Sequence, residues 1–435
     1  DLIIGALTQF GLSSVKLTAA MPRDERYRNY LEAMRRPISI VVGTRSAIFA
    51  PVINLTTVII HKESSLEHYE VRSPGWNTRT VALIRSEVES FKLVLTGFSP
   101  SIEVSQLIDE REIKYLNAKE SVTVKAFTPS EGALLPGRIF TDVKKALTSG
   151  PVLFIAPRKG YGNALLCAHC RNVAACECGG RLSVSGKGNA PSCVHCGNSF
   201  PAWKCTFCNR DKQYLAGRGI ERAAEEISRA FPNFPVVISA GEVIKDRIEA
   251  RPALVLATPG AQPQVEGGYA AVVILEGLRF FAHTDLRTQE RARELFLETS
   301  SLISPEGSVL LVIDDSHPIV SAIARWNIAP LLKRELSERA ELKLPPSVFS
   351  VVLVMDQAIG MQIANGLKKA AAEGRIPPSS CIYGPTEISK GQVKIVIHAD
   401  KKDASALTDS MHELQRRRSI AKKELFTLRV EPYSL

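Results

Sequence analysis

Four close cysteine pairs, Cys167-Ala-His-Cys170, Cys176-Glu-Cys178, Cys193-Val-His-Cys196 and Cys205-Thr-Phe-Cys208, hold eight of the nine cysteines of this 435-residue chain. A Cys-x-x-Cys pair places two thiolates on one tight turn, and two such pairs complete the tetrahedral four-sulfur site that Zn²⁺ accepts. The stretch therefore predicts two structural zinc ions. His169 and His195 lie inside the turns, but four complete pairs need neither histidine as a ligand.

Three other uses of these thiols have to be weighed. Four disulfides suit a small secreted scaffold, and not a cluster inside a long chain whose remaining cysteine is Cys381. Redox chemistry calls for a single Cys-x-x-Cys on a thioredoxin-like unit. An iron–sulfur cluster also uses thiolates and stays open. The paired spacing and the glycine-rich polar loop over 179–190 favour zinc, although the pair at 176–178 has only one intervening residue.

The composition is that of an ordinary soluble globular protein, with 45% hydrophobic and 23% charged residues and a length sufficient for two to four domains. No apolar run approaches the length of a membrane span, so no membrane partner is expected. The net charge of +10 favours a polyanionic partner, nucleic acid before an anionic membrane. The reduced cysteines predict a cytoplasmic protein. The chain starts at Asp1 and not at methionine, so we expect a preceding segment.

Short apolar runs, typical of parallel strands buried on both faces, alternate with helical patterns on both sides of the cysteines and predict two α/β lobes. In the first, strands are expected at 38–42, 57–60 and 92–95, with helices over 2–10 and 77–89. In the second, helices are expected over 136–147 and 220–231, with strands at 152–156, 236–238, 253–257, 270–275 and 308–313. The cysteine stretch follows the 152–156 strand and is therefore an insertion.

The last hundred residues predict a separate small α+β domain. The patterns give strands at 348–355, 381–383, 393–398 and 426–431 and helices over 358–372 and 403–417, the β-α-β-β-α-β order of a ferredoxin-like fold. Cations crowd the end of the second helix: Arg416, Arg417, Arg418, Lys422 and Lys423. They either complement the helix dipole or meet phosphates.

Local stretches across nearly the whole chain resemble the PriA family of bacterial replication-restart proteins, which are superfamily 2 DNA helicases of the primosome. Val41-Val42-Gly43-Thr44-Arg45-Ser46-Ala47-Ile48-Phe49 is similar to the family's V-G-T-R-S-A-L-F, and Gly75-Trp76 to its aromatic-rich DNA-sensing loop. Ala164-Leu165-Leu166-Cys167 is similar to the A-L-L-C entry of its zinc unit. Leu344-Pro345-Pro346 and Val430-Glu431-Pro432 resemble the start and end of its C-terminal domain.

The resemblance implies an α/β protein with four parts. A partial helicase-like lobe would cover 1–115, and a second lobe 116–166 and 209–330. A two-zinc insertion would cover 167–208, and a ferredoxin-like domain 331–435. The family's fork-binding domain and phosphate-binding loop would precede Asp1. The resemblance also implies nested zinc binding, with Cys167, Cys170, Cys205 and Cys208 on one ion and Cys176, Cys178, Cys193 and Cys196 on the other. Spacing alone leaves sequential or interleaved pairing open.

The ATPase motifs of the family are not preserved. An acidic pair is needed for Mg²⁺ and for the attacking water. The family's D-E-E-H is here His61-Lys62-Glu63-Ser64, which keeps only Glu63. Its G-S-A-T-P motif is Thr96-Gly97-Phe98-Ser99-Pro100, and its G-T-Q-M motif is Ala257-Thr258-Pro259-Gly260. The region of its final arginine motif, 297–303, holds no arginine. We therefore expect no catalytic residues and no use of ATP and Mg²⁺ for hydrolysis.

The resulting hypothesis is a replication-restart protein that binds DNA forks or single-stranded DNA and helps a helicase loader, with other primosome proteins, to reload the replicative helicase without unwinding DNA itself. It would work in the cytoplasm, at the nucleoid. Two alternatives stay open: an active ATP-dependent 3′–5′ DNA helicase, and a zinc scaffold for primosome protein contacts. Candidate DNA contacts are Arg45, Trp76, Arg79, Lys187, Lys204 and Arg210, and Trp203 lies beside them in sequence. For Trp76 the alternative is a half-buried anchor, and for Arg45 and Arg79 a surface salt bridge.

Overall fold

A computed structural model describes residues 2–35, 40–72, 75–117, 122–130, 133–157, 165–170, 172–184, 189–194, 196–215, 220–283, 285–389 and 391–435. Two compact units make up the chain. Residues 1–112 and 334–435 form the first, and residues 113–333 form the second. In the described part of the chain, no helix is both long and apolar enough to cross a membrane.

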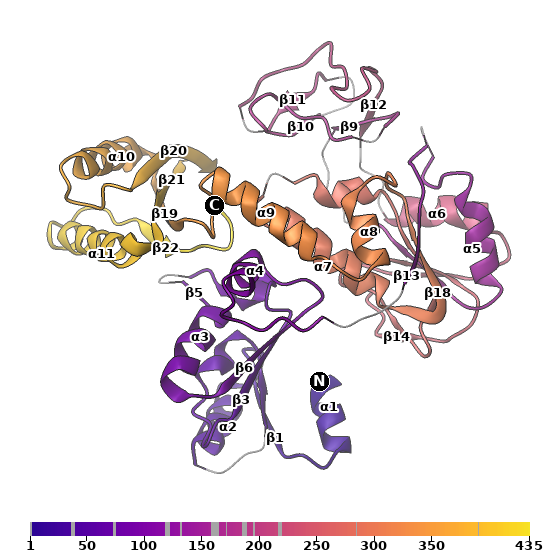
Figure 1. The fold of residues 1–435 in the computed structure, drawn as a ribbon, viewed down its shortest axis with the longest axis horizontal. Coiled ribbons are helices and arrows are strands. Elements are labelled where there is room, and N and C mark those ends of the chain that lie inside the picture. Colours follow the sequence, from indigo (N-terminus) through magenta and orange to yellow (C-terminus); the bar gives the residue numbers. More distant parts are fainter. Residues whose placement is uncertain are drawn as a thin grey trace. The chain divides into compact units, whose positions relative to one another are not determined.

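A six-stranded parallel sheet forms the centre of the second unit (Figure 1). Its strands lie in the order β13 (Val236–Ser239), β15 (Leu254–Ala257), β8 (Val152–Ile155), β17 (Tyr269–Ile274), β18 (Ile303–Leu311) and β7 (Thr123–Ala126). Every residue of β8 and β15 is buried. This explains why both strands are continuous apolar runs, as expected where both faces of a parallel sheet are covered. The sheet confirms the mixed α/β class.

Helices α5 (Ile139–Leu147) and α6 (Ile220–Ala230) cover one face of this sheet. Their buried faces meet Phe154 of β8 in a single apolar core. Further helical segments of this unit are η3 (Gly277–Phe281), α7 (Thr288–Ser300) and α8 (Pro318–Ala324), and α9 (Ala329–Glu341) begins in it and continues into the first unit. Two predicted bounds are corrected: α5 begins at Ile139 and not at 136, and β18 begins at Ile303 and not at 308.

The cysteine-rich segment leaves and re-enters the second unit through a pair of antiparallel strands. These are β9 (Leu165–Cys167) and β12 (Gln213–Leu215), in which Cys167 lies opposite Gln213. A second antiparallel pair, β10 (Leu182–Ser183) and β11 (Ser192–Cys193), lies between them in sequence. A short parallel pair, β14 (Arg247–Ile248) and β16 (Gln264–Val265), lies elsewhere in the unit.

The N-terminal part of the first unit contains two separate parallel strand pairs. One joins β1 (Ser14–Leu17) to β2 (Ile40–Gly43), and the other joins β3 (Thr57–His61) to β6 (Lys92–Thr96). The expectation of doubly buried strands is wrong for β3, because Ile59 is 67% exposed and only the opposite face of the strand packs against α3 (Thr78–Glu89). The other elements are α1 (Leu2–Gln9), α2 (Arg23–Arg35), η1 (Arg45–Phe49), η2 (Leu66–His68), β4 (Tyr69–Glu70), β5 (Trp76–Asn77) and α4 (Ile102–Asp109).

Gly43 is required where β2 ends. A Cβ atom at this position would lie 2.3 Å from the carbonyl oxygen of Leu17 and 2.4 Å from Cβ of Ala47. Neither distance is possible for a real side chain, so only glycine lets β1 and η1 approach the end of β2 this closely. Arg45, two residues later, is thereby fixed at the start of η1.

The C-terminal part of the first unit has the predicted β-α-β-β-α-β element order. The elements are β19 (Phe349–Asp356), α10 (Gln357–Ala372), β20 (Cys381–Ser389), β21 (Gln392–Ala399), η4 (Lys401–Asp403), α11 (Ala404–Ile420) and β22 (Thr427–Val430). The antiparallel sheet has the order β20-β21-β19-β22, and both helices share its core. β20 continues to Ser389 and not only to 383, because its pairing with β21 extends past two register shifts.

Candidate metal centre

The structure brings the four thiols at the two ends of the cysteine-rich segment into one group. Sγ of Cys167 lies 3.4 Å from Sγ of Cys208, and Sγ of Cys170 lies 3.6 Å from Sγ of Cys205. All four sulfur atoms lie within 4.8 Å of one another. The β9–β12 pairing explains the approach, because it places the turn after Cys167 beside the chain that returns from Cys208.

The four inner cysteines form a second group of the same kind. Sγ of Cys176 lies 3.6 Å from Sγ of Cys196, and Sγ of Cys178 lies 3.5 Å from Sγ of Cys193. All four are again within 4.8 Å of one another. Cys193 ends β11, which pairs with β10, and Cys196 follows in the turn after this strand. Among the pairings that spacing alone leaves open, the structure has the nested one.

These distances indicate the chemistry that the thiols can support. A disulfide needs sulfur atoms about 2.05 Å apart, so none of these four cysteine pairs is bonded. Four sulfurs at about 2.3 Å from a tetrahedral Zn²⁺ would lie about 3.8 Å from one another. The observed spacing fits a four-sulfur metal site, and each group could hold one ion with no position left for water. His169 is exposed and outside both groups, and His195 lies outside the described residues.

Burial and backbone hydrogen bonds act in opposite directions on the thiols of the first group. Burial raises the pKa of Cys167, and it raises the pKa of Cys170 to about 12. At Cys208 a hydrogen bond from the backbone N–H of Arg210 lowers the pKa to about 6. A cation must displace the remaining thiol protons in order to bind, so metal binding should release protons into solution.

The apolar core of this segment is small and consists largely of the ligands themselves. Its buried members are Leu165, Cys167, Ala174, Cys176, Leu182, Cys193, Trp203 and Cys205. So few apolar side chains cannot hold a stable fold, and small units of this kind depend on metal or disulfide cross-links. We therefore expect bound metal ions to be the main stabilising element of the segment.

A hydrogen bond ties the segment to the parallel sheet. The hydroxyl of Tyr214, on β12, donates to Oε1 of Glu276 at 2.7 Å. Glu276 lies two residues after the end of β17, in a left-handed conformation with φ of 47°, and its Oε2 accepts from Arg279 at 2.5 Å. The base of the cysteine-rich segment is thereby held near the carboxyl end of the interior strand β17.

The candidate DNA contacts of this segment differ in position. Lys204 and Arg210 are exposed on either side of the last cysteine pair, and Lys187 lies outside the described residues. Trp203 is 6% exposed and belongs to the core. Phe207, which sequence reasoning passed over, is 77% exposed inside the Cys205–Cys208 turn. An aromatic residue between two ligands of one turn is the sequence signal that could have found it.

Arg45 and Trp76 form one compact contact group in the first unit. The guanidinium of Arg45 donates to the carbonyl oxygens of Glu67, at 3.1 Å, and of Tyr69, and it pairs with Glu70 at 2.9 Å. The guanidinium also lies 5.8 Å from the centre of the Trp76 ring, which contacts the Phe49 ring edge-on at 4.9 Å. Both side chains are partly exposed and hold the β4–β5 hairpin against η1. This arrangement favours an anchoring role, and their part in DNA binding stays a prediction.

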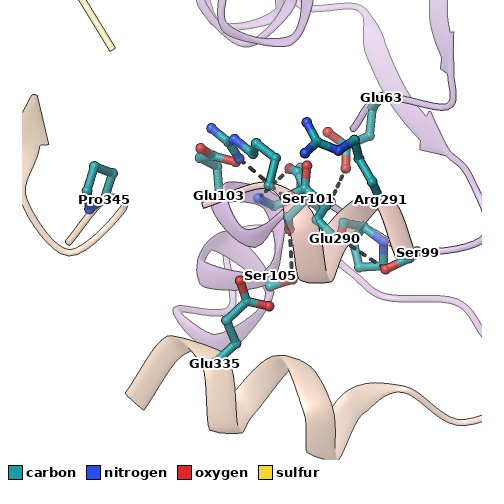
Figure 2. Close-up of polar contacts among 12 residues, drawn as sticks. Glu63, Ser99, Ser101, Glu103, Ser105, Glu290, Arg291, Glu335 and Pro345 are labelled. Atoms are coloured by element: carbon teal, nitrogen blue, oxygen red, sulfur yellow. Dashed lines mark hydrogen bonds and ion pairs between the residues drawn. The ribbon is translucent and has the colours of Figure 1, made fainter. Parts of the chain in front are cut away.

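Arg79 does not lie at the surface where a phosphate contact or a surface salt bridge was expected. It is 7% exposed, because its guanidinium faces the start of α4. Its Nη1 donates to Glu63 at 2.9 Å and to the hydroxyl of Ser101 at 2.8 Å, and its Nη2 lies 3.5 Å from Glu103. Glu63 is 3% exposed and also accepts from the backbone N–H of Ser101. Figure 2 shows Glu63, Ser101 and Glu103 gathered at this helix start. Glu63, the one acidic residue that the resemblance places in an ATPase motif, is thus held in a buried ion pair.

Known proteins of similar sequence are replication restart proteins. No protein-family model matches the chain. The chain is 32% identical over 402 residues to the probable replication restart protein PriA of Mycobacterium leprae, covering 87% of this chain and 60% of the relative. It is 34% identical over 363 residues to that of Mycobacterium tuberculosis, covering 78% of this chain and 55% of the relative. The PriA of Bacillus subtilis is 21% identical over 472 residues, covering 98% and 58%.

The chain spans between 55% and 60% of the length of these three relatives. The matches nevertheless cover most of this chain, and the cysteine-rich segment lies within the matched part. Over most of its length, therefore, this chain is a homologue of the replication restart proteins named PriA.

Proposed function

We propose that this protein acts in replication restart by binding forked or single-stranded DNA and by helping other primosome proteins and a helicase loader to reload the replicative helicase. The homology to PriA carries the proposal. The net charge of +10 supports it, because cations clustered on a protein surface bind phosphates and release counterions. On this proposal the protein works in the cytoplasm, at the nucleoid.

The architecture that goes with this role is a helicase-like one. Residues 1–115 would be a partial first lobe, residues 116–166 and 209–330 the second, 167–208 a two-zinc insertion and 331–435 a ferredoxin-like domain. The all-parallel sheet of six strands supports the second lobe. The β20-β21-β19-β22 sheet with two helices on one face supports the last domain. The two four-sulfur groups support zinc as the resident metal.

We propose further that the protein does not hydrolyse ATP. Phosphoryl transfer needs one carboxylate for Mg²⁺ and another group to orient water. Glu63 is engaged by Arg79 and by the amide of Ser101, so its oxygens are already committed to two donors. Lys62 stands beside it, where a cation would repel Mg²⁺. Restart would then depend on recognition and loading, with unwinding left to other proteins.

The test is a binding titration of the full-length protein against a model fork and a blunt duplex of equal length. We expect tighter binding to the fork, and an observed association constant that falls steeply with salt on a log–log plot. Equal affinity for fork and duplex would count against fork recognition. A salt-independent affinity would count against phosphate contacts and would favour a protein-docking zinc scaffold.

A further inference from the structure

The turn between Cys205 and Cys208 is a rigid platform that carries one exposed aromatic ring. The N–H of Asn209 donates to the carbonyl oxygen of Cys205 at 2.8 Å, and the N–H of Cys205 donates to the carbonyl oxygen of Arg210 at 2.8 Å. Both cysteines also belong to the first four-sulfur group. The four-sulfur group holds Cys205 and Cys208, and the two backbone hydrogen bonds hold Cys205, Asn209 and Arg210, so the turn that carries Phe207 is anchored at both ends.

Phe207 stands apart from the other aromatic residues of the segment. Trp203 is buried in the core, and Phe200 packs against the same core. Phe207 is 77% exposed and takes no part in that packing. A single exposed apolar side chain is common on protein surfaces and carries no meaning alone. The charged residues near Phe207 in the sequence indicate what its exposed ring could bind.

Two cations flank the ring at the base of the turn. Lys204 precedes Cys205, and the hydrogen bond from Cys205 to Arg210 brings the chain at 204–205 beside Arg210. Both side chains are exposed, and neither makes an ion pair with any residue that the structure describes. The turn thus carries an exposed aromatic ring, with an exposed cation before it and another after it in the sequence.

We infer that this turn binds single-stranded nucleic acid, with an unpaired base stacked on Phe207 and the neighbouring phosphates on Lys204 and Arg210. Inside a duplex both faces of every base are covered by neighbouring base pairs, so only an unstacked base, as in a single strand, can lie on the ring. A phenyl ring has no hydrogen-bonding group, so the contact tolerates any base. The cations suit phosphates and disfavour an apolar protein partner. The inference rests on the proposed DNA-binding function and assigns the single-stranded part of it to one turn.

The experiment compares Phe207→Ala, Phe207→Leu and Phe207→Trp in the full-length protein. Fluorescence anisotropy would follow binding to a labelled oligothymidylate and to a blunt duplex, and metal content would be measured for each variant. Loss of one stacked base weakens binding on the order of 5- to 100-fold. We expect that loss for Phe207→Ala and Phe207→Leu on the single strand, with duplex affinity unchanged, and near-native binding for Phe207→Trp.

Val194→Ala is the matched control, because Val194 is 49% exposed in the turn of another cysteine pair and has no ring. Its single-strand affinity should stay at the wild-type value. Native affinity in Phe207→Leu would mean that the site needs bulk and not stacking, and would overturn the inference. Unchanged binding in Phe207→Ala, with fork binding intact, would overturn it while leaving the proposed function standing. Failure of the wild-type protein to bind any DNA would overturn both.

Discussion

Replacing Arg79 by alanine tests the buried ion pair that engages Glu63. The two side chains are 8% and 3% exposed, and their charged atoms lie 2.9 Å apart. Removing one partner leaves the other charge buried with one hydrogen-bond donor fewer. Breaking such a pair costs about 3–5 kcal/mol. We expect the free energy of unfolding of the first unit to fall by about this amount, with α4 affected most because Arg79 also binds Ser101 at its start.

Hydrogen exchange followed by mass spectrometry can measure this loss locally. The amide of Ser101 donates to Glu63, so its opening reports on the pair directly. A loss of about 3 kcal/mol would speed exchange through that opening by on the order of 100-fold. Arg28→Ala is the control, because Arg28 pairs with Asp24 at 3.2 Å while both side chains are more than 70% exposed. That pair should contribute only about 0.3–0.5 kcal/mol.

A double variant separates the charge from the packing. Glu63→Leu combined with Arg79→Met replaces the pair by apolar groups, and such replacements recover much of the stability that a single removal loses. If Arg79→Ala lowered the free energy of unfolding no more than Arg28→Ala does, Glu63 would not be held in a buried ion pair. The reasoning that it is unavailable to Mg²⁺ and water would then be refuted.

Three further perturbations have defined outcomes. Chelation should release two metal ions per chain and unfold the 165–215 segment while the parallel sheet persists by circular dichroism; one ion per chain, or a segment still protected from protease afterwards, would contradict the two four-sulfur groups. Gly43→Ala should destabilise the first unit by about 2 kcal/mol or more, because the new Cβ would meet the Leu17 carbonyl. Gly5→Ala in α1 is the control and should be neutral or stabilising, because its Cβ would meet nothing within 4 Å. Equal urea midpoints for the two variants would show that the backbone at Gly43 can relax. Hydrogen bonds from Arg416 and Arg417 lower the pKa of Glu413 to about 2. The pairing therefore stabilises the folded state at pH values above the ordinary carboxylate pKa, and this stabilisation is lost as the pH falls toward 2. An NMR titration in which Glu413 has an ordinary midpoint would show that the pairs do not persist in solution.

The metal groups were the part most accessible to sequence reasoning. In a long chain with reduced cysteines, cysteine pairs at turn spacing mainly bind metal, and four pairs predict two ions. The pairing of Cys167 with Cys208 could not follow from spacing, because it depends on β9 meeting β12 across forty-odd intervening residues. Local patterns do not encode such a long-range register.

The first unit shows where local reasoning fails. Arg79 sits in the first turn of an amphipathic helix, and a charged side chain there gives no local signal that it is buried. Its partners Glu63 and Ser101 come from segments 16 and 22 residues away. Apolar runs predicted β3 correctly, but they could not show that one face of that strand stays open at Ile59, because exposure depends on what packs against the strand and not on the strand itself.

ATP turnover by the full-length protein in the presence of forked DNA bears on the proposal of recognition without unwinding. We expect fork binding with no DNA-stimulated phosphate release above background, and no difference between the wild-type protein and Glu63→Gln. DNA-stimulated phosphate release that is lost in Glu63→Gln would contradict this, because it would show that Glu63 serves catalysis and that the protein is an active motor.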